Sequence, residues 1–215
     1  FIDTLRGHAK DDPEARERFL GIMAVEAGRM RRLIDDLLSL TRIELNEHNA
    51  PSGAADLVAI AQQTAAALAP LAAADGISIK IESHEPVRVV GDRDELAQVL
   101  QNLMHNAIKY GRENGEVRVR FGDAGAQGGR DGHRLAFVAV EDEGEGIPRE
   151  AIPRLTERFY RVDVKRSRER GGTGLGLAIV KHVLLRHQAS LEVTSEPGVG
   201  SEFSVVFPPW RTVSS

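Results

Sequence analysis

The sequence has no cysteine, few aromatic residues and no long apolar segment. Without cysteine, disulfides, thiolate nucleophiles and cysteine-ligated zinc or iron–sulfur sites are excluded. Aromatic residues make up 5% of the chain, too few for a base-stacking surface, and a net charge of -4 gives no overall attraction to nucleic acid. The apolar run at 65–74 is shorter than the roughly 17 to 25 residues of a membrane span, and no signal peptide opens the chain. We therefore expect a cytoplasmic type of protein, with no nucleic-acid partner and no membrane segment in this chain.

The first part of the chain has the pattern of bundle helices. After a break at 7–12, Asp12 is a predicted N-cap and Pro13 occupies the first helical position, which both residue types favour. From 19 to 44, apolar residues recur alternately every four and every three residues, as in a helix packed in a bundle. We expect residues 1–46 to form a helical hairpin that pairs with a second copy as a four-helix bundle. The alternative is a helix that lies on the chain's own second domain.

A linker rich in Asn, His, Pro, Ser and Gly follows at 47–55, and the pattern then becomes mixed α and β over 56–210. Asp92 with Glu95 is a capping-box signal for a helix that ends at Gly111. The glycine-rich segment 122–134 is predicted to be a hairpin loop without chemistry. The other predicted helices are 56–74 and 175–186, and the predicted strands are 77–81, 117–121, 135–141, 191–195 and 202–207.

One face of the predicted helix at 92–111 carries polar side chains that suit a nucleotide. Asn102, Asn106, Lys109 and Tyr110 are spaced so that all four project from roughly the same face. Amide oxygens are suitable ligands for Mg²⁺, and a lysine supplies a point charge for phosphate. Taken alone, the same residues could be the solvated face of an amphipathic helix.

Two glycine motifs flank a basic segment. Asp142, after a predicted strand, can accept the exocyclic amine of adenine, and the nearby glycines allow close backbone approach. The glycine run at 171–176 precedes a helix whose free N–H groups could bind phosphate. It does not follow a strand and has no Gly-Lys-Ser/Thr ending, which excludes the Rossmann and P-loop motifs. Between the two, residues 154–170 hold seven Lys or Arg and three acids, a local charge of +4 that is typical of a lid over an anion.

In this order the motifs resemble those of the sensor histidine kinases of two-component systems. The segment Asn102–Tyr110 is similar to their N box, Asp142–Gly146 to the first glycine box, Leu155–Arg161 to the F box and Gly172–Gly176 to the second glycine box. The resemblance implies an α/β sandwich ATP-binding domain of the gyrase/Hsp90/histidine-kinase/MutL type after the helical hairpin. Residues 11–47 look most similar to phosphate-regulon sensor kinases.

The resemblance also implies roles for individual residues, with ATP and Mg²⁺ as cofactors. Asn106 would hold Mg²⁺, and Asn102 and Lys109 would complete the catalytic set beside the phosphates. Asp142 would accept the adenine amine and Tyr110 would pack against the base. Arg158 would contact nucleotide or the helical domain, and His105 has no expected catalytic role. The other implied nucleotide contacts are Gly144, Gly146, Tyr160, Gly172, Thr173, Gly174, Leu175 and Gly176.

The implied function is ATP-dependent autophosphorylation on a histidine, followed by transfer to an aspartate of a response-regulator receiver domain, in a homodimer. His8 is followed by Ala9 and Lys10 and does not match the family's His-Glu/Asp segment, so we expect the acceptor upstream of Phe1. The chain would then be the cytoplasmic portion of a membrane-bound sensor. The alternatives are a non-enzymatic dimeric ATP-binding regulatory module and an ATP-hydrolysing clamp of the gyrase or MutL kind.

Overall fold

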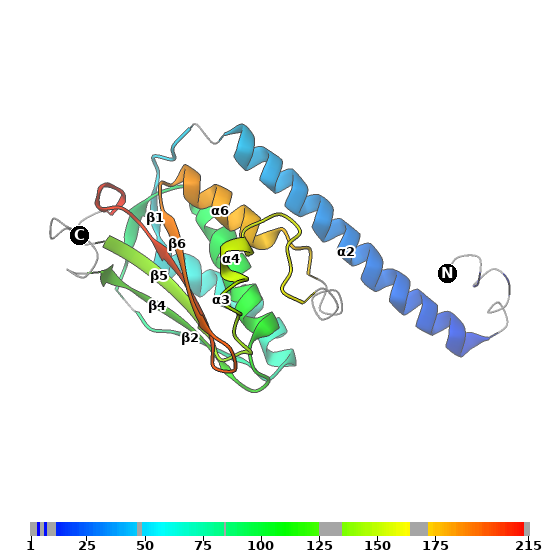
Figure 1. The fold of residues 1–215 in the computed structure, drawn as a ribbon. Coiled ribbons are helices and arrows are strands. Elements are labelled where there is room, and N and C mark those ends of the chain that lie inside the picture. The colour runs from blue at the N-terminus through cyan, green and yellow to red at the C-terminus, as the bar shows by residue number, and fades with distance from the viewer. Residues whose placement is uncertain are drawn as a thin grey trace.

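The structure is a computed structural model in which a long helix precedes a two-layer α/β domain (Figure 1). The order of a helical part followed by an α/β sandwich is as predicted. Three parts of the chain lie outside the described residues: most of residues 1–11 at the start of the predicted hairpin, the segment 125–134, and the basic segment 164–171. The residues that the structure describes are 4, 7, 12–46, 49–83, 85–124, 135–163 and 172–212.

Helix α2 (Pro13–Leu45) extends away from the α/β domain, and its last turns lie against that domain (Figure 1). The predicted cap is confirmed, because Asp12 accepts the N–H of Ala15 at 2.9 Å. Leu40 and Ile43 are buried against the α/β domain. The alternative prediction, in which the helix lies on the chain's second domain, therefore holds only for the C-terminal end of α2. The large apolar side chains of α2 that remain exposed are Leu20, Ile22, Val25, Met30, Ile34, Leu37, Leu38 and Leu45.

The main sheet has the strand order β2-β4-β5-β7-β6, with β2 parallel to β4 and the other pairs antiparallel. A separate pair, β1 with β3, is antiparallel and was not predicted; β1 begins within the predicted linker. The five predicted strands are confirmed, but the predicted loop 122–134 is wrong at its start, because residues 122–124 belong to a strand. The strands are β1 (Ala54–Asp56), β2 (Ser78–Ile81), β3 (Arg88–Val90), β4 (Glu116–Ala124), β5 (Leu135–Asp142), β6 (Ser190–Glu196) and β7 (Gly200–Val206).

Three helices cover one face of the sheet: α3 (Leu57–Ala74), α4 (Arg93–Tyr110) and α6 (Gly176–Arg186) (Figure 1). The core lies between these helices and the sheet. By length and composition α3 could cross a membrane, with a mean hydropathy of 1.5. We interpret it as a core helix because it packs against α4 and β2 with its buried side chains. Short 3₁₀ turns follow at Ile152–Arg154 and Pro209–Arg211.

Helix α4 begins at the predicted cap, but the predicted capping box is wrong in one respect. Asp92 accepts the N–H groups of Asp94 and Glu95 at 2.9 and 3.1 Å. The Glu95 carboxylate does not return to the cap, because it is paired with Arg186 of α6. The backbone N–H of Asp92 instead donates to Nε2 of His187 at 3.0 Å. The fully buried His187 therefore joins the end of α6 to the start of α4.

Candidate nucleotide site

A cavity of about 430 Å³ opens between α4, the end of β5, the segments 155–163 and 172–177, and α2. Two predicted site residues do not line it. Leu175 is fully buried in the domain core. Gly144 donates its N–H to Asp142 but does not itself line the cavity. The predicted residues that the structure brings together here are Asn102, Asn106, Lys109, Tyr110, Asp142, Gly146, Tyr160, Gly172, Thr173, Gly174 and Gly176.

The face of α4 that lines the cavity is mainly polar, because the aliphatic side chains of this helix are buried in the domain core. Nδ2 of Asn102 donates to the Gln98 carbonyl at 2.9 Å. A Cβ at Gly176 would lie 2.6 Å from Oδ1 of Asn102, so a larger residue at the start of α6 would displace the Asn102 side chain. Lys109 is largely buried, with Nζ 4.8 Å from the centroid of the Tyr110 ring.

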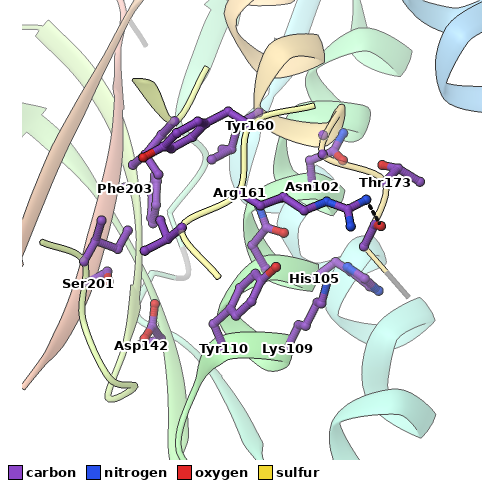
Figure 2. A pocket seen from close by; sticks show the side chains of 18 of the residues that line it. Asn102, His105, Lys109, Tyr110, Asp142, Tyr160, Arg161, Thr173, Ser201 and Phe203 are labelled. Atoms are coloured by element: carbon purple, nitrogen blue, oxygen red, sulfur yellow. Dashed lines mark hydrogen bonds between the residues drawn. The ribbon is translucent and has the colours of Figure 1, made fainter. Parts of the chain in front are cut away.

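Asp142 lies at one end of the cavity with Ser201 and Tyr110, while Asn102 and Thr173 lie at the other (Figure 2). Its side chain is 6% exposed, and one oxygen accepts the N–H of Gly144 at 2.8 Å. Burial raises the pKa of Asp142 to about 6; the Gly144 N–H opposes this shift. A buried carboxylate with one oxygen still available is a strong acceptor for a ligand N–H.

Two of the predicted glycines have backbone conformations that other residues rarely adopt. Gly146 has φ +69°, and a Cβ there would lie 2.1 Å from the carbonyl oxygen of Glu196. Gly174 has φ +76° and lies against the backbone of Phe159, whose N–H donates to the Gly174 carbonyl at 2.8 Å. This bond closes the base of the segment between them, from which Tyr160 lines the cavity.

The end of the cavity near α6 contains hydroxyl and guanidinium donors. Arg161 donates to the Gly172 carbonyl at 2.6 Å (Figure 2). The Thr173 hydroxyl accepts the Leu175 N–H at 3.3 Å and donates to Asp36 of α2 at 2.7 Å. Arg158, predicted to contact nucleotide or the helical domain, is paired with Glu44 of α2 and so contacts the helix.

Sequence reasoning missed several lining residues. His105, expected to have no role, lines the cavity; partial burial, Lys109 and Arg32 all lower its pKa. Its position three residues after Asn102 was a usable signal, because residues three apart share a helix face. No sequence signal pointed to the residues of α2. The other missed residues include Arg32, Asp35, Asp36, Gln98, Gln101, Arg161, Ser201 and Phe203.

The donor set fits a magnesium–nucleotide complex better than a protein-only metal site. Within the part of the chain that the structure describes, no group of three or more His, Asp or Glu residues could hold a metal ion. Mg²⁺ in nucleotide sites takes few protein ligands and completes its shell with phosphate oxygens and water. Asn106, which lines the cavity with Asn102 and Lys109, offers one such ligand.

Comparison with known proteins identifies a family and its curated members. Residues 91–211 match the model of the histidine kinase-, DNA gyrase B-, and HSP90-like ATPases. The phosphate regulon sensor protein PhoR of Pseudomonas aeruginosa is 41% identical over 212 residues, 97% of this chain and 45% of that protein. The sensor-like histidine kinase SenX3 of Mycolicibacterium smegmatis is 36% identical over 200 residues, 93% of this chain and 50% of its own length. The chain spans about half the length of these relatives.

Solved structures share the fold. The mycobacterial sensor histidine kinase MprB aligns with a TM-score of 0.60 and 27% identity, over 75% of this chain and 99% of that one. Full-length ShkA, solved in complex with AMPPNP, aligns with a TM-score of 0.72 and 26% identity, over 94% of this chain and 40% of ShkA. The predicted α/β sandwich of the histidine-kinase type, preceded by a helical part, is confirmed.

Proposed function

This chain belongs to the histidine kinase-, DNA gyrase B-, and HSP90-like ATPases, and within them to the sensor histidine kinases; from that premise we propose that it is the phosphotransfer and ATP-binding core of a two-component sensor. As an ATP:protein-histidine phosphotransferase, it moves the γ-phosphoryl group of ATP to a histidine and then to an aspartate of a response regulator. The observation that carries this proposal is the single cavity that joins Asp142 to Asn106, Lys109 and the start of α6. The helices then occupy 1–46, the linker 47–55 and the ATP-binding domain 56–210.

The two ends of the cavity suit the two ends of ATP. The free oxygen of the Asp142 carboxylate accepts the adenine amine, with Tyr110 against the base. The phosphates lie toward Asn102, Lys109 and the N-terminus of α6, where N–H groups and the helix dipole favour anions. Gly144 acts indirectly by orienting Asp142 through its N–H, and Leu175 by its N–H to Thr173.

Asn106 is the proposed Mg²⁺ ligand. Mg²⁺ neutralises developing charge on the transferred phosphoryl group when it is bound. The contribution of the chain is then to position the nucleotide and to place the Lys109 cation beside its phosphates. Helix α2 contains no histidine. His8 does not match the His-Glu/Asp segment of the family, so we propose that the acceptor belongs to a helical segment outside these 215 residues.

Asn106→Asp is expected to weaken Mg²⁺–ATP binding by about tenfold or more, because a carboxylate faces the triphosphate where a neutral ligand stood. Calorimetric titration of the 215-residue chain with ATP, with and without Mg²⁺, measures this. Adenosine affinity stays unchanged, since the base end of the cavity is intact. Gln62→Glu adds the same charge on the exposed face of α3 and serves as the control. Equal ATP affinity in both variants, or no binding by the wild type, contradicts the site.

Phosphoryl transfer is tested in the longer protein that carries the acceptor. Incubation with γ-labelled ATP is expected to give an acid-labile, base-stable phosphohistidine. Steady ATP hydrolysis without such a product favours the gyrase-type clamp. ATP binding with neither product nor hydrolysis favours the non-enzymatic module, although the related proteins are named as kinases.

The exposed apolar side of α2 is the proposed dimer surface. Met30 belongs to the predicted bundle pattern and is 62% exposed. Met30→Glu is expected to weaken dimerisation by about 100-fold or more, because the bundle would bury an unpaired carboxylate. Sedimentation equilibrium measures the change. The control Leu71→Glu alters an exposed leucine of α3 and leaves the dimer intact. A Met30→Glu protein as dimeric as the wild type contradicts this surface.

The remaining partner and location follow from the same family. We propose a response-regulator receiver domain as the phosphoryl acceptor, with no nucleic-acid partner. We also propose that the chain is the cytoplasmic portion of a membrane-bound sensor, whose membrane segments lie outside this chain. The support is the likeness to proteins named as sensors.

A further inference from the structure

The C-terminal half of α2 meets the ATP-binding domain largely through polar contacts. Ser39 and Gln98 exchange hydrogen bonds at 2.7 and 2.9 Å. Glu44 is paired with Arg158 and lies 3.5 Å from His182. Apolar burial from α2 is confined to Leu40 and Ile43. Domain interfaces this polar generally permit relative motion of their parts.

One of these contacts occupies a group of the proposed phosphate end. The Thr173 hydroxyl donates to Oδ2 of Asp36 at 2.7 Å, and Thr173 lies three residues before Gly176, the first residue of α6. A hydroxyl has one proton to donate. Thr173 can therefore donate to Asp36 or to a phosphate oxygen, but not to both. The Asp36 carboxylate thus stands where a phosphate anion would bind.

The side of α2 that lines the cavity also disfavours a second anion. It carries Asp35 and Asp36 against the single cation Arg32. Burial and the neighbouring Asp35 raise the pKa of Asp36, which Thr173 and Arg32 only partly offset. Among the described residues, no cation forms an ion pair with Asp36. The contact therefore places a poorly compensated carboxylate beside the cavity, and a triphosphate there would repel it.

We propose that Asp36 is an internal competitor of ATP: the docked C-terminal half of α2 and the nucleotide phosphates exclude each other at Thr173. This inference rests on the proposed function and adds a regulation of the same site. Because coupling between two binding events is reciprocal, bound ATP releases α2 from the domain, and holding α2 against the domain weakens ATP binding. Any movement that pulls α2 away then loads the site with nucleotide.

Affinity measurements on the 215-residue chain test this competition. Asp36→Ala is expected to bind ATP about 3- to 10-fold more tightly than the wild type, the range set by removing one competing charged hydrogen bond. Adenosine affinity is unchanged because adenosine has no phosphates. Asp35→Ala removes the same charge from the adjacent lining residue, for which the structure gives no bond to Thr173, and is expected to tighten ATP binding less than Asp36→Ala does. Equal tightening by both variants overturns the proposal, because general charge repulsion would then explain it.

A distance measurement gives a second readout. The chain has no cysteine, so Glu17→Cys on α2 and Glu150→Cys on the domain, both exposed, provide the only two labelled positions of a protomer; dimers that mix labelled with excess unlabelled protomers report the distance within one protomer. Saturating ATP is expected to change the distance distribution, and Asp36→Ala is expected to shift it without ATP. An ATP-bound chain with the distribution of the free chain overturns the competition alone. A wild type that binds no ATP overturns the proposed function itself.

Discussion

Asp142→Asn is expected to reduce ATP affinity by about 100-fold or more, because a buried donor replaces a buried acceptor opposite the adenine amine. One carboxylate oxygen is occupied by the Gly144 N–H, at 2.8 Å. The asparagine oxygen keeps this bond, and its NH₂ group then faces the amine, donor against donor. Calorimetric titration is expected to show reduced affinity for both ATP and adenosine, because the substitution changes the end of the cavity that binds the base.

The same substitution is expected to stabilise the folded chain at pH 7, by about 1–2 kcal/mol after the new amide's own burial is counted. The pKa of Asp142 is about 6 in the folded state against 3.8 for the ordinary group. Between these values the folded state binds more protons than the unfolded state, so the wild type loses stability as pH rises through that window. Asp142→Asn has no such titration, so its stability relative to the wild type increases from pH 4 to pH 7.

Chemical denaturation at several pH values measures this difference. Glu143→Gln removes the same charge from the adjacent, exposed residue and is the control, with wild-type affinity and stability. An Asp142→Asn protein that binds ATP within threefold of the wild type would show that adenine lies elsewhere. A variant less stable than the wild type at pH 7 would show that the buried charge is compensated.

His187→Ala is expected to lower the free energy of unfolding by about 3 kcal/mol, because it leaves the Asp92 N–H unpaired and opens a cavity beneath α4. The imidazole is fully buried. Its neutral form satisfies both partners, with Nδ1–H donating to the Val183 carbonyl at 2.8 Å and Nε2 accepting from Asp92. His187→Gln keeps an acceptor and is expected to recover part of the loss. His182→Ala, on the same helix, is the control with a small effect.

Acid is expected to destabilise the fold through the same residue. Burial, Arg186 and Arg211 lower the pKa of His187 below its ordinary 6.5; the Val183 carbonyl and Asp92 act in the opposite direction, and Glu95 lies 3.8 Å from Nδ1. The unfolded chain therefore binds a proton at a higher pH than the folded chain, and stability falls as pH drops below about 6.5. Denaturation of the wild type and of His187→Gln at pH 5–8 measures this. Parallel pH profiles, or full stability of His187→Ala, contradict the assignment.

Local signals in the sequence predicted the main elements, and long-range contacts account for the errors. Asp12 and Asp92 are caps in the structure because a cap depends only on its own turn. Glu95 has the spacing of a capping box, yet Arg186, distant in sequence, takes its carboxylate. The pair β1 and β3 was missed because each strand has only three residues, and the whole of α3 and β2 lies between the paired Ala54 and Val90 in the chain.

The candidate site divides in the same way. Asn102, Asn106 and Asp142 are placed in the cavity by helical spacing and by a strand end, both of which are visible in the sequence. Arg32 and Asp36 could not be predicted, because the face of α2 that meets the domain depends on how the intervening linker directs the helix. Arg186 helps to set that direction, by donating to the carbonyls of Asn46 and Asn49 while it holds Glu95.

The backbone bond between Phe159 and Gly174 has a consequence for how such domains diverge. It joins the two ends of the intervening segment at its base, so the domain core does not depend on the length of chain between them. Doubling the length of a closed loop costs only about 0.6 kcal/mol. Insertions between these two residues are therefore expected to cost little folding free energy, so the surface of this segment can change over evolution without a change to the domain core.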